Sequence, residues 1–591
     1  MNIKTTWNLG LMYKSPKDPQ IEKDIKAIET ACAAFERKYK NSDFIKTPEL
    51  LAKALNDYEK LRDTTGNKPW QYFALQTDLD SSNSQAGAAA TRIEQRINKA
   101  TNRTTFFTLQ IAKIPTKEHK NFLEYPALVP FRYMLQRIFL RAKYNLTEAE
   151  EQLEDLLSQT SYTMWVDAQE RILSQKTVDY KGDHLPLAKA FSYINELPKK
   201  ERAVLNKKIT DILKAQSPIA EAEINAVYNY KKVMDERRGF AAPTTETAMA
   251  HQLDEKALQQ LVMTVTKSFP IAHRFYKLHA KLLGEKTIPL HDRNVKIGTI
   301  KKKFEFEKSV GIVRDGFVKV DQKYVKIFDG FLKNGQIDVY PKKGKHGGAY
   351  CWASGMKDDP TWVFLNHSDD LRSVETLAHE MGHAMHSELS KSQPPRYRRY
   401  STATAEVAST FFEQLIVDEL SHHLSDREAM MLLHNKILSD ISTVFRQIAC
   451  YNFELELHQK IRAEGQVNAK VIAELLQKHM KSYVGPAVQV TPDDGYFFVS
   501  WSHIRSFFYV SSYAYGQLIS KAMYNRWKAD PAFSQQVEKF LSAGGSDTPE
   551  NIFKSIGIDT SKESFWIAGL KSIEEDVIQL EKMAKKLEKK K

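Results

Sequence analysis

Two histidines and a glutamate stand together in the run His379-Glu380-Met381-Gly382-His383. In a helix, histidines four positions apart lie on one face, close enough to bind the same cation. Glu380 lies beside that face, where it can reach a water bound to that cation and act as a general base. Imidazole suits zinc, and a catalytic zinc site takes three protein ligands and a water. The run therefore predicts one Zn²⁺ per chain, bound by His379, His383 and a third ligand further along.

The residues around the two histidines favour a helix. Ser368, Asp369 and Asp370 offer capping side chains and negative charge at its start. Apolar residues then recur at helical spacing and form a stripe beside the histidines: Val374, Leu377, Ala378, Met381 and Met385. Gly382 weakens the helix, which indicates that another backbone packs closely against it. The alternative is a surface helix with two ordinary histidines, and the apolar stripe argues against it.

A second helix is expected from about Ser401, after the proline-rich and basic connector 393–400. Glu406 is an acid among small and apolar neighbours, and a carboxylate buried there without a partner would be costly. A metal ion would explain it, so Glu406 is the best candidate for the third ligand, the alternative being a salt-bridged glutamate. Glu413, about two helical turns further on, is the rival ligand.

His386 lies near the same face of the first helix, seven positions after His379. That spacing corresponds to a rise of roughly 10 Å, whereas a Zn–N bond is only about 2 Å long. His386 is therefore interpreted as a neighbour of the metal site.

The clearest strand signals precede the first of these helices. Short runs rich in β-branched and aromatic residues cover 336–340, 347–352 and 361–365. They predict a small sheet at about 336–366, next to the zinc helices at about 369–420. In Gly347-Gly348-Ala349-Tyr350 the glycines leave room for another backbone. An exposed strand edge there could bind an extended peptide substrate by main-chain hydrogen bonds, although a purely structural hairpin has the same pattern.

Residues 496–515 are dense in aromatic side chains. Most of them fit a core or the wall of a channel, but His503 and Tyr509 also bring hydrogen-bond donors. A tetrahedral oxyanion needs donors in addition to a metal, so these two are candidate catalytic residues, with Tyr513 and Tyr515 as alternatives that contact the substrate. In one continuous helix His503 would point away from Tyr509. Both can serve one site only if His503 lies in a turn before the helix.

Several stretches carry a combined pattern that is more specific than the metal motif alone. They are His379 through His386, Ala405-Glu406-Val407-Ala408-Ser409, Gly347 through Cys351, Trp501-Ser502-His503 with Tyr509, Tyr513 and Gly516, Trp7-Asn8-Leu9, Asp18-Pro19, Ile556 through Asp559, and Phe565-Trp566. Together they resemble the oligoendopeptidase F branch of the thimet and oligoendopeptidase F family of zinc metallopeptidases. One departure is that the branch often has Pro-His-Phe where this chain has His503-Ile504-Arg505.

This resemblance implies a mainly α, two-lobed helical metallopeptidase that encloses a deep channel and hydrolyses short oligopeptides. Helical spacing recurs through much of the chain, in 18–40, 48–62, 88–114, 147–157 and 160–175. The polar break at 179–183 suggests a boundary between an N-terminal helical lobe, 1–185, and a catalytic zinc metallopeptidase domain, 186–591.

Composition limits the remaining classes of function. A chain of 591 residues exceeds a single small core, and 42% hydrophobic with 27% charged residues is ordinary for a globular protein. No run approaches the length of a membrane span, and the first residues lack the apolar region of a signal peptide. The net charge of +13 raises nucleic acid as a partner, but the charge is dispersed and no nucleic-acid motif accompanies it. Three widely separated cysteines fit a reducing cytosol. We therefore expect a cytoplasmic protein whose partners are peptides.

Two alternatives remain beside a zinc endopeptidase. A zinc carboxypeptidase of a related helical fold would need a cation for the free carboxylate of its substrate, and no residue in the sequence identifies one. A peptide-binding protein with a vestigial metal site would not need Glu380, which is intact.

Overall fold

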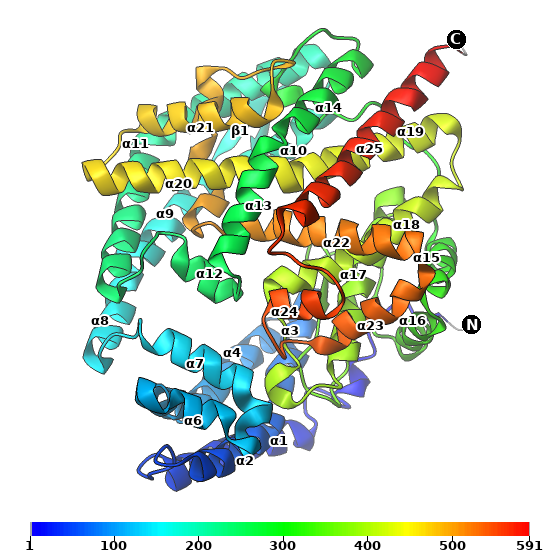
Figure 1. Cartoon of the computed structure of the whole chain (residues 1–591). Helices are drawn as coiled ribbons and strands as arrows, with labels where there is room; N and C mark the ends of the chain where they lie inside the picture. The colour runs from blue at the N-terminus through cyan, green and yellow to red at the C-terminus, as the bar shows by residue number, and fades with distance from the viewer. Residues whose placement is uncertain (1–2, 590–591) are drawn as a thin grey trace. The chain divides into compact units, whose positions relative to one another are not determined.

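The structure is a computed structural model that describes residues 3–589. It divides into two compact units, each assembled from three separate stretches of chain. Unit 1 comprises residues 1–143, 301–420 and 523–557, and unit 2 comprises residues 144–300, 421–522 and 558–591. Helices dominate both units, as Figure 1 shows, and the mainly α fold class is thereby confirmed. The consecutive lobes 1–185 and 186–591 are a different division of the chain and stay a prediction.

Unit 1 contains the candidate metal ligands. Its α-helices are α1 (Pro19–Tyr39), α2 (Pro48–Thr64), α3 (Lys68–Leu79), α4 (Ser84–Asn102), α5 (Phe106–Ile111), α6 (His119–Glu124), α7 (Arg132–Ala142), α15 (Phe306–Val320), α16 (Gln322–Asn334), α17 (Leu371–Ser390), α18 (Thr402–Ser421), α23 (Ser534–Ala543) and α24 (Pro549–Ser555). Short 3₁₀ turns are η1 (Leu9–Leu11), η2 (Thr116–Glu118), η3 (Pro126–Phe131), η7 (Pro395–Tyr397) and η11 (Pro531–Phe533). The first helices pack around a core that includes Ile25, Phe35 and Phe107.

Unit 2 contains the aromatic residues 496–515. Its α-helices are α8 (Glu148–Ser158), α9 (Met164–Ser174), α10 (Leu187–Tyr193), α11 (Lys199–Arg238), α12 (Thr245–His251), α13 (Glu255–Lys267), α14 (Phe269–Leu282), α19 (Asp426–Asp440), α20 (Gln447–Glu464), α21 (Ala469–Val484) and α25 (Glu563–Glu588). The 3₁₀ and π turns are η4 (Gln159–Thr163), η5 (Ile194–Glu196), η6 (Leu290–Asp292), η8 (Ile441–Arg446), η9 (Pro492–Val499) and η10 (Ser502–Arg505). Strands β1 (Thr177–Tyr180) and β2 (Asp183–Pro186) pair antiparallel, and β3 (Ile288–Pro289) pairs parallel with β7 (Val488–Gln489). Helix α22 (Ser511–Ala529) begins in unit 2, and its residues from Met523 belong to unit 1.

The predicted small sheet is present in unit 1. Strand β6 (Trp362–Phe364) lies between β4 (Ile337–Asp338), which is parallel to it, and β5 (Tyr350–Trp352), which is antiparallel. The N-terminal segment joins this sheet, because the Trp7 backbone N–H donates to Asp338 Oδ2 at 3.1 Å and its indole Nε1–H donates to the Val363 carbonyl at 2.9 Å. Strand β5 is thus left at an edge of the three-stranded sheet.

Local sequence explains why α17 forms and where it packs. Asp370 caps its start by accepting a hydrogen bond from the Ser373 N–H at 2.8 Å. The predicted apolar stripe is buried throughout. At Gly382 the backbone of α18 comes so close that an added Cβ would lie 2.7 Å from Ser409 Cα. The expectation of a close backbone at this glycine is confirmed, and the contact fixes α17 and α18, here called the helix pair, against each other.

Helix boundaries differ from the sequence patterns in two places. The expected helix 88–114 is interrupted after Asn102, where Thr104 Oγ1 donates to the Thr101 carbonyl at 2.7 Å and competes with the helical backbone bonds. The polar break at 179–183 is the turn of the β1–β2 hairpin, in which Lys181 and Gly182 both have positive φ. Within residues 3–589, no helix combines the length and apolar character that crossing a membrane requires.

Candidate metal centre

His379 and His383 on α17 and Glu406 on α18 bring three ligand atoms together. Nε2 of His379 lies 3.7 Å from Glu406 Oε2, and Nε2 of His383 lies 3.9 Å from Glu406 Oε1. All three ligand atoms lie within 4.8 Å of one another. Ligand atoms that each bond at about 2 Å to one Zn²⁺ lie at most about 4 Å apart, and the two nitrogen–oxygen distances meet this limit. Two imidazoles and a carboxylate therefore fit a catalytic zinc ion, and in residues 3–589 no other group of three or more metal-ligating side chains has this geometry.

Glu413, the rival ligand, contacts the other nitrogen of His379. The Nδ1–H of His379 donates to Glu413 Oε2 at 2.8 Å, which leaves Nε2 as the ligand atom. Burial opposes a charge on this imidazole, but the hydrogen bond to Glu413 and the nearby carboxylates raise the pKa of His379 to about 9. Burial lowers the pKa of His383 to about 3.

Glu380 lies on α17 between the two histidines and is only 6% exposed. The nearby backbone N–H of Cys351 on β5 favours the charged form of its carboxylate. Burial raises the pKa of Glu380 to about 7, and the charge of His379 opposes that rise. A carboxylate with such a pKa can accept and release a proton near neutral pH, which is what general acid–base catalysis needs.

The environments of Glu406 and His386 refine two interpretations from the sequence. The premise that Glu406 is buried is wrong, because its side chain is 41% exposed and faces the histidines across an open pocket. His386 is fully buried, stacks on the Tyr400 ring at 3.5 Å and lies outside the three-ligand group. It packs beside the metal site, as the helical rise predicts.

A cavity of about 720 Å³ opens in front of the helix pair. Its lining includes His379, Glu380, His383 and Glu406, together with Ala349 and Tyr350 of the predicted peptide-binding edge. The Tyr350 ring stacks on Phe364 at 4.9 Å, and its hydroxyl donates to Asp78 at 2.5 Å. A Cβ added at Gly347 or Gly348 would meet no atom within 4 Å. The strand edge beside the metal ligands therefore has open space on its glycine side.

The aromatic–histidine segment, residues 496–515, lies in unit 2. His503 is in η10, before α22 begins at Ser511, as the condition from the sequence requires. His503 Nε2 and the Tyr513 hydroxyl form a hydrogen bond of 3.2 Å, and the Tyr509 ring lies 6.3 Å from the His503 ring. Tyr515 instead packs in the core against Trp566 and is 1% exposed. The segment thus groups His503, Tyr509 and Tyr513 and separates Tyr515 from them.

Comparison with known proteins identifies the family. A profile described as Peptidase family M3 matches residues 234–572, and one described as Oligopeptidase F matches residues 110–175. The first match covers more than half of the chain. The chain belongs to peptidase family M3. Its membership makes it a peptidase, and the His-His-Glu group agrees with the metallopeptidase chemistry of the family.

The alignments with related sequences and with solved structures cover almost the full length of this M3 chain. It is 25% identical to Oligopeptidase PepF of Bacillus subtilis, covering 99% of this chain and 88% of that relative. It is 25% identical to an oligoendopeptidase F homolog of Borreliella burgdorferi, covering 95% of each. A putative peptidase from Chlamydophila abortus has the same fold with a TM-score of 0.86, 19% identity and 98% coverage of both chains. Oligoendopeptidase-F from Enterococcus faecium aligns with a TM-score of 0.69, 17% identity and coverage of 96% and 98%.

Sequence reasoning missed three features of this M3 site. The Cys351 backbone near Glu380 lies in a strand whose register no local pattern gives. The role of Glu413 as the partner of His379 depends on the distance between two helices. Lys391 and Arg399 also line the cavity. The basic connector 393–400 was a signal for Arg399, but only the fold shows that this residue reaches the metal pocket.

Proposed function

We propose that the protein is a zinc-dependent metalloendopeptidase that hydrolyses short oligopeptides. One observation carries the proposal: His379, His383 and Glu406 form a three-ligand group, and Glu380 stands between the two histidines in the same open cavity. A metal site with three protein ligands leaves a position for water and substrate, whereas a structural zinc site is closed by four.

Bound zinc would supply Lewis acidity, which polarises a scissile carbonyl and lowers the pKa of water. Glu380 accepts the proton of the attacking water and transfers it to the leaving amine. The nearby Cys351 N–H favours the charged form of the Glu380 carboxylate, and the hydrogen bond to Glu413 orients the His379 ring. Neither a serine nor a cysteine nucleophile is needed.

The oxyanion donors in this proposal are His503 and Tyr509, with Tyr513 as the next candidate. The contact between His503 and Tyr513 supports a common role for these groups, because it orients the imidazole. The burial of Tyr515 argues against a part for it. Hydrogen-bond donors of this kind act on charge that develops only in the transition state.

The substrate class follows from the open strand edge. An extended peptide that pairs with β5 near Ala349 and Tyr350 would place its backbone beside the metal ligands, since these residues line one cavity. The two relatives named above carry the descriptions oligopeptidase and oligoendopeptidase, which favours short peptides over folded proteins. We place the activity in the cytoplasm because of the cysteine pattern.

A zinc carboxypeptidase is the second candidate function. The position of Arg399 supports it, because this side chain supplies a cation for a substrate carboxylate. Arg399 lines the metal cavity and donates to the Ser354 carbonyl at 3.1 Å. Within residues 3–589 it forms no ion pair with a carboxylate, and burial followed by the charge of Arg62 lowers its pKa. Lys391, by contrast, is already paired with Glu388 at 2.8 Å. Arg399 could therefore bind a substrate carboxylate, either at the C-terminus or on a side chain.

Digestion of a peptide blocked at both ends separates these candidates. We expect cleavage at an internal bond, about one zinc per chain by elemental analysis, and loss of activity with a chelator. A requirement for a free C-terminal carboxylate would identify a carboxypeptidase instead. The third outcome is a protein purified without zinc that cleaves neither the blocked peptide nor a peptide with a free C-terminus after zinc is added. This result would favour a peptide-binding function.

A further inference from the structure

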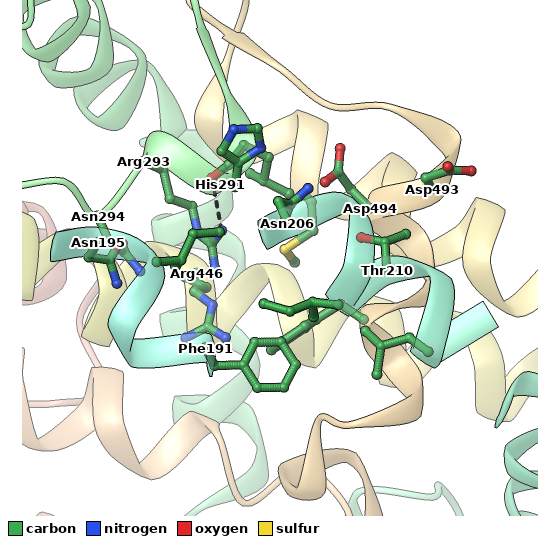
Figure 2. A pocket seen from close by; sticks show the side chains of 16 residues that line it. Phe191, Asn195, Asn206, Thr210, His291, Arg293, Asn294, Arg446, Asp493 and Asp494 are labelled. Atoms are coloured by element: carbon green, nitrogen blue, oxygen red, sulfur yellow. Dashed lines mark hydrogen bonds between the residues drawn. The ribbon is translucent and has the colours of Figure 1, made fainter. Parts of the chain in front are cut away.

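A second cavity lies wholly inside unit 2, and none of its lining residues has a role in the proposed function. Figure 2 shows this pocket, whose lining comes from η5, α11, η6, η8, α21 and η9 and from residues near them. Its solvent space is about 100 Å³. This space is enough for a small polyatomic ligand.

Two arginines line this pocket without an acidic partner. Within residues 3–589 neither Arg293 nor Arg446 forms an ion pair with a carboxylate, and Arg293 donates only to the Leu290 carbonyl, at 2.9 Å. Burial lowers the pKa of Arg446, and the charge of Arg293 lowers it further. Two partly buried guanidinium groups that repel each other are unfavourable unless an anion joins them.

The Arg446 guanidinium is held in position by aromatic rings. Its central carbon lies 4.4 Å from the centre of the Trp501 ring and 5.8 Å from that of Phe497. Arg446 also ends the π turn η8, and such turns occur frequently at functional sites. The side chain is therefore oriented by contacts that leave its hydrogen-bond donors unused.

The acidic residues of the pocket are separated from the arginines. Figure 2 shows Arg293 and Arg446 on the same side as Asn195 and Asn294, whereas Asp493 and Asp494 lie on the other side. Asp493 pairs with Lys214 at 2.5 Å. Asp494 accepts hydrogen bonds from the Thr491 N–H at 2.7 Å and hydroxyl at 2.8 Å. His291, the remaining titratable group of the lining, lies close enough to Asp494 to be affected by its charge.

We propose that Arg293 and Arg446 form a binding site for a small oxyanion in this pocket. The forked guanidinium groups match the oxygens of phosphate or of a carboxylate, and the small solvent space favours a small anion. Two sources supply this chemistry: inorganic phosphate, or the carboxylate of a small peptide product. Because Trp501 directly precedes η10, an occupant would also fix the turn that carries His503.

The test is titration calorimetry of phosphate into the intact zinc-loaded protein at constant ionic strength. We expect saturable binding in the wild type and at least about tenfold weaker binding in Arg446→Gln and in Arg293→Gln, the scale of one lost charged hydrogen bond. Arg171→Gln is the matched control, because it removes the same charge from an exposed position of α9 in unit 2. A control that binds like the wild type supports the site.

Three results would overturn the proposal. The first is the absence of saturable phosphate binding, and the second is an equally weakened binding in Arg171→Gln. The third is unchanged binding in both pocket variants, which would assign the bound phosphate to the metal centre. If Arg446→Gln does not fold, Arg293→Gln decides. Competition with the dipeptide Gly-Gly distinguishes the sources: displacement of phosphate supports the carboxylate of a product, and no displacement supports the inorganic anion.

Discussion

The helix pair in unit 1 and the aromatic–histidine segment in unit 2 position their side chains in opposite ways. His379 and His383 stand one helical turn apart on a regular α-helix, and Glu406 faces them from a second helix that the bare backbone of Gly382 brings into contact. The other segment has 3₁₀ turns and two successive residues in the left-handed region, Phe507 and Phe508, at φ 40° and 61°. Regular backbone fixes the metal geometry, whereas irregular backbone must be held by its surroundings.

Glu454 provides that support in unit 2. It is fully buried, and its Oε1 accepts a hydrogen bond from the Phe508 N–H at 3.1 Å. Thr247 donates to the neighbouring Phe507 carbonyl at 2.8 Å. Left-handed conformations of such residues cost about 1–3 kcal/mol each and persist only when surrounding contacts hold them. The difference teaches that the candidate metal ligands depend on a local repeat, whereas the histidine–tyrosine group depends on a tertiary network.

Glu380→Gln tests the helix pair with the largest expected effect. The amide keeps the shape of the side chain but cannot accept a proton, so we expect kcat to fall by at least ~10², with zinc retained. Turnover of a blocked peptide and elemental analysis measure the two quantities. Near-normal turnover in a zinc-loaded variant would remove Glu380 from its role as the base.

Tyr509→Phe and His503→Ala carry the same test to the irregular segment. An oxyanion donor contributes roughly 3–4 kcal/mol, so kcat should fall by about 10²–10³ while KM changes little. Tyr515→Phe is the control, since this ring lies in the core. If Tyr509→Phe has the kcat of the wild type, the same substitution at Tyr513 is the next measurement. Variants that lose stability but keep kcat would show that the segment has only a structural role.

Much of the helix pair is predictable from sequence because helical periodicity directly reports which residues share a face. The short strands are also predictable from their composition, and the close approach of α18 is predictable from Gly382. The partner of His379 is not predictable, since Glu413 and Glu406 both fit the spacing and only the interhelical distance separates them. The core position of Tyr515 depends on Trp566, which is remote in sequence. No local sequence pattern predicts the left-handed backbone conformation of Phe507 and Phe508 or the proximity of Arg293 to Arg446.

Glu406→Gln and Glu413→Gln sharpen the distinction between a ligand and its neighbour. Glu406→Gln should lower zinc affinity most, because it removes a ligand charge. Glu413→Gln should lower it by about 10–100-fold, the usual scale for a group that orients a metal-binding histidine. Competition with a zinc chelator measures both. The reverse order of affinities would make Glu413 the third ligand.

Gly382→Ala tests the close approach of α17 and α18. The new Cβ would lie 2.7 Å from Ser409 Cα, so we expect a loss of about 1–3 kcal/mol in the free energy of unfolding. Gly330→Ala on α16 is the matched control, because its Cβ would meet no atom within 4 Å and alanine favours a helix. Chemical denaturation measures both variants, and equal stability would show that the helix pair separates without cost.

Glu454→Gln tests the support of the irregular segment through the pH dependence of stability. Burial raises the pKa of Glu454 to about 8, so between its ordinary value of 4.5 and about 8 the folded protein retains a proton that the unfolded chain has lost. Wild-type stability must therefore fall as pH rises through that window. The variant should lack this component and gain at least about 1.4 kcal/mol relative to wild type at the upper end, one pKa unit being worth that much. The measurement is the unfolding midpoint of the wild type and of the variant as a function of pH. Parallel profiles of the two proteins would contradict this prediction.

The hydrogen bonds from Trp7 to Asp338 and Val363 impose an order on biosynthesis. Trp7 leaves the ribosome long before its strand partners, and at about 5–20 residues per second the delay is roughly 20–70 s. Unit 1 also needs residues 523–557. The nascent N-terminal helices must therefore wait with the Trp7 side chain unpaired, while the first stretch of unit 2 is translated. Chaperone dependence should consequently extend from this early interval to near the end of translation, because α17 and α18 lie in a unit that is complete only then.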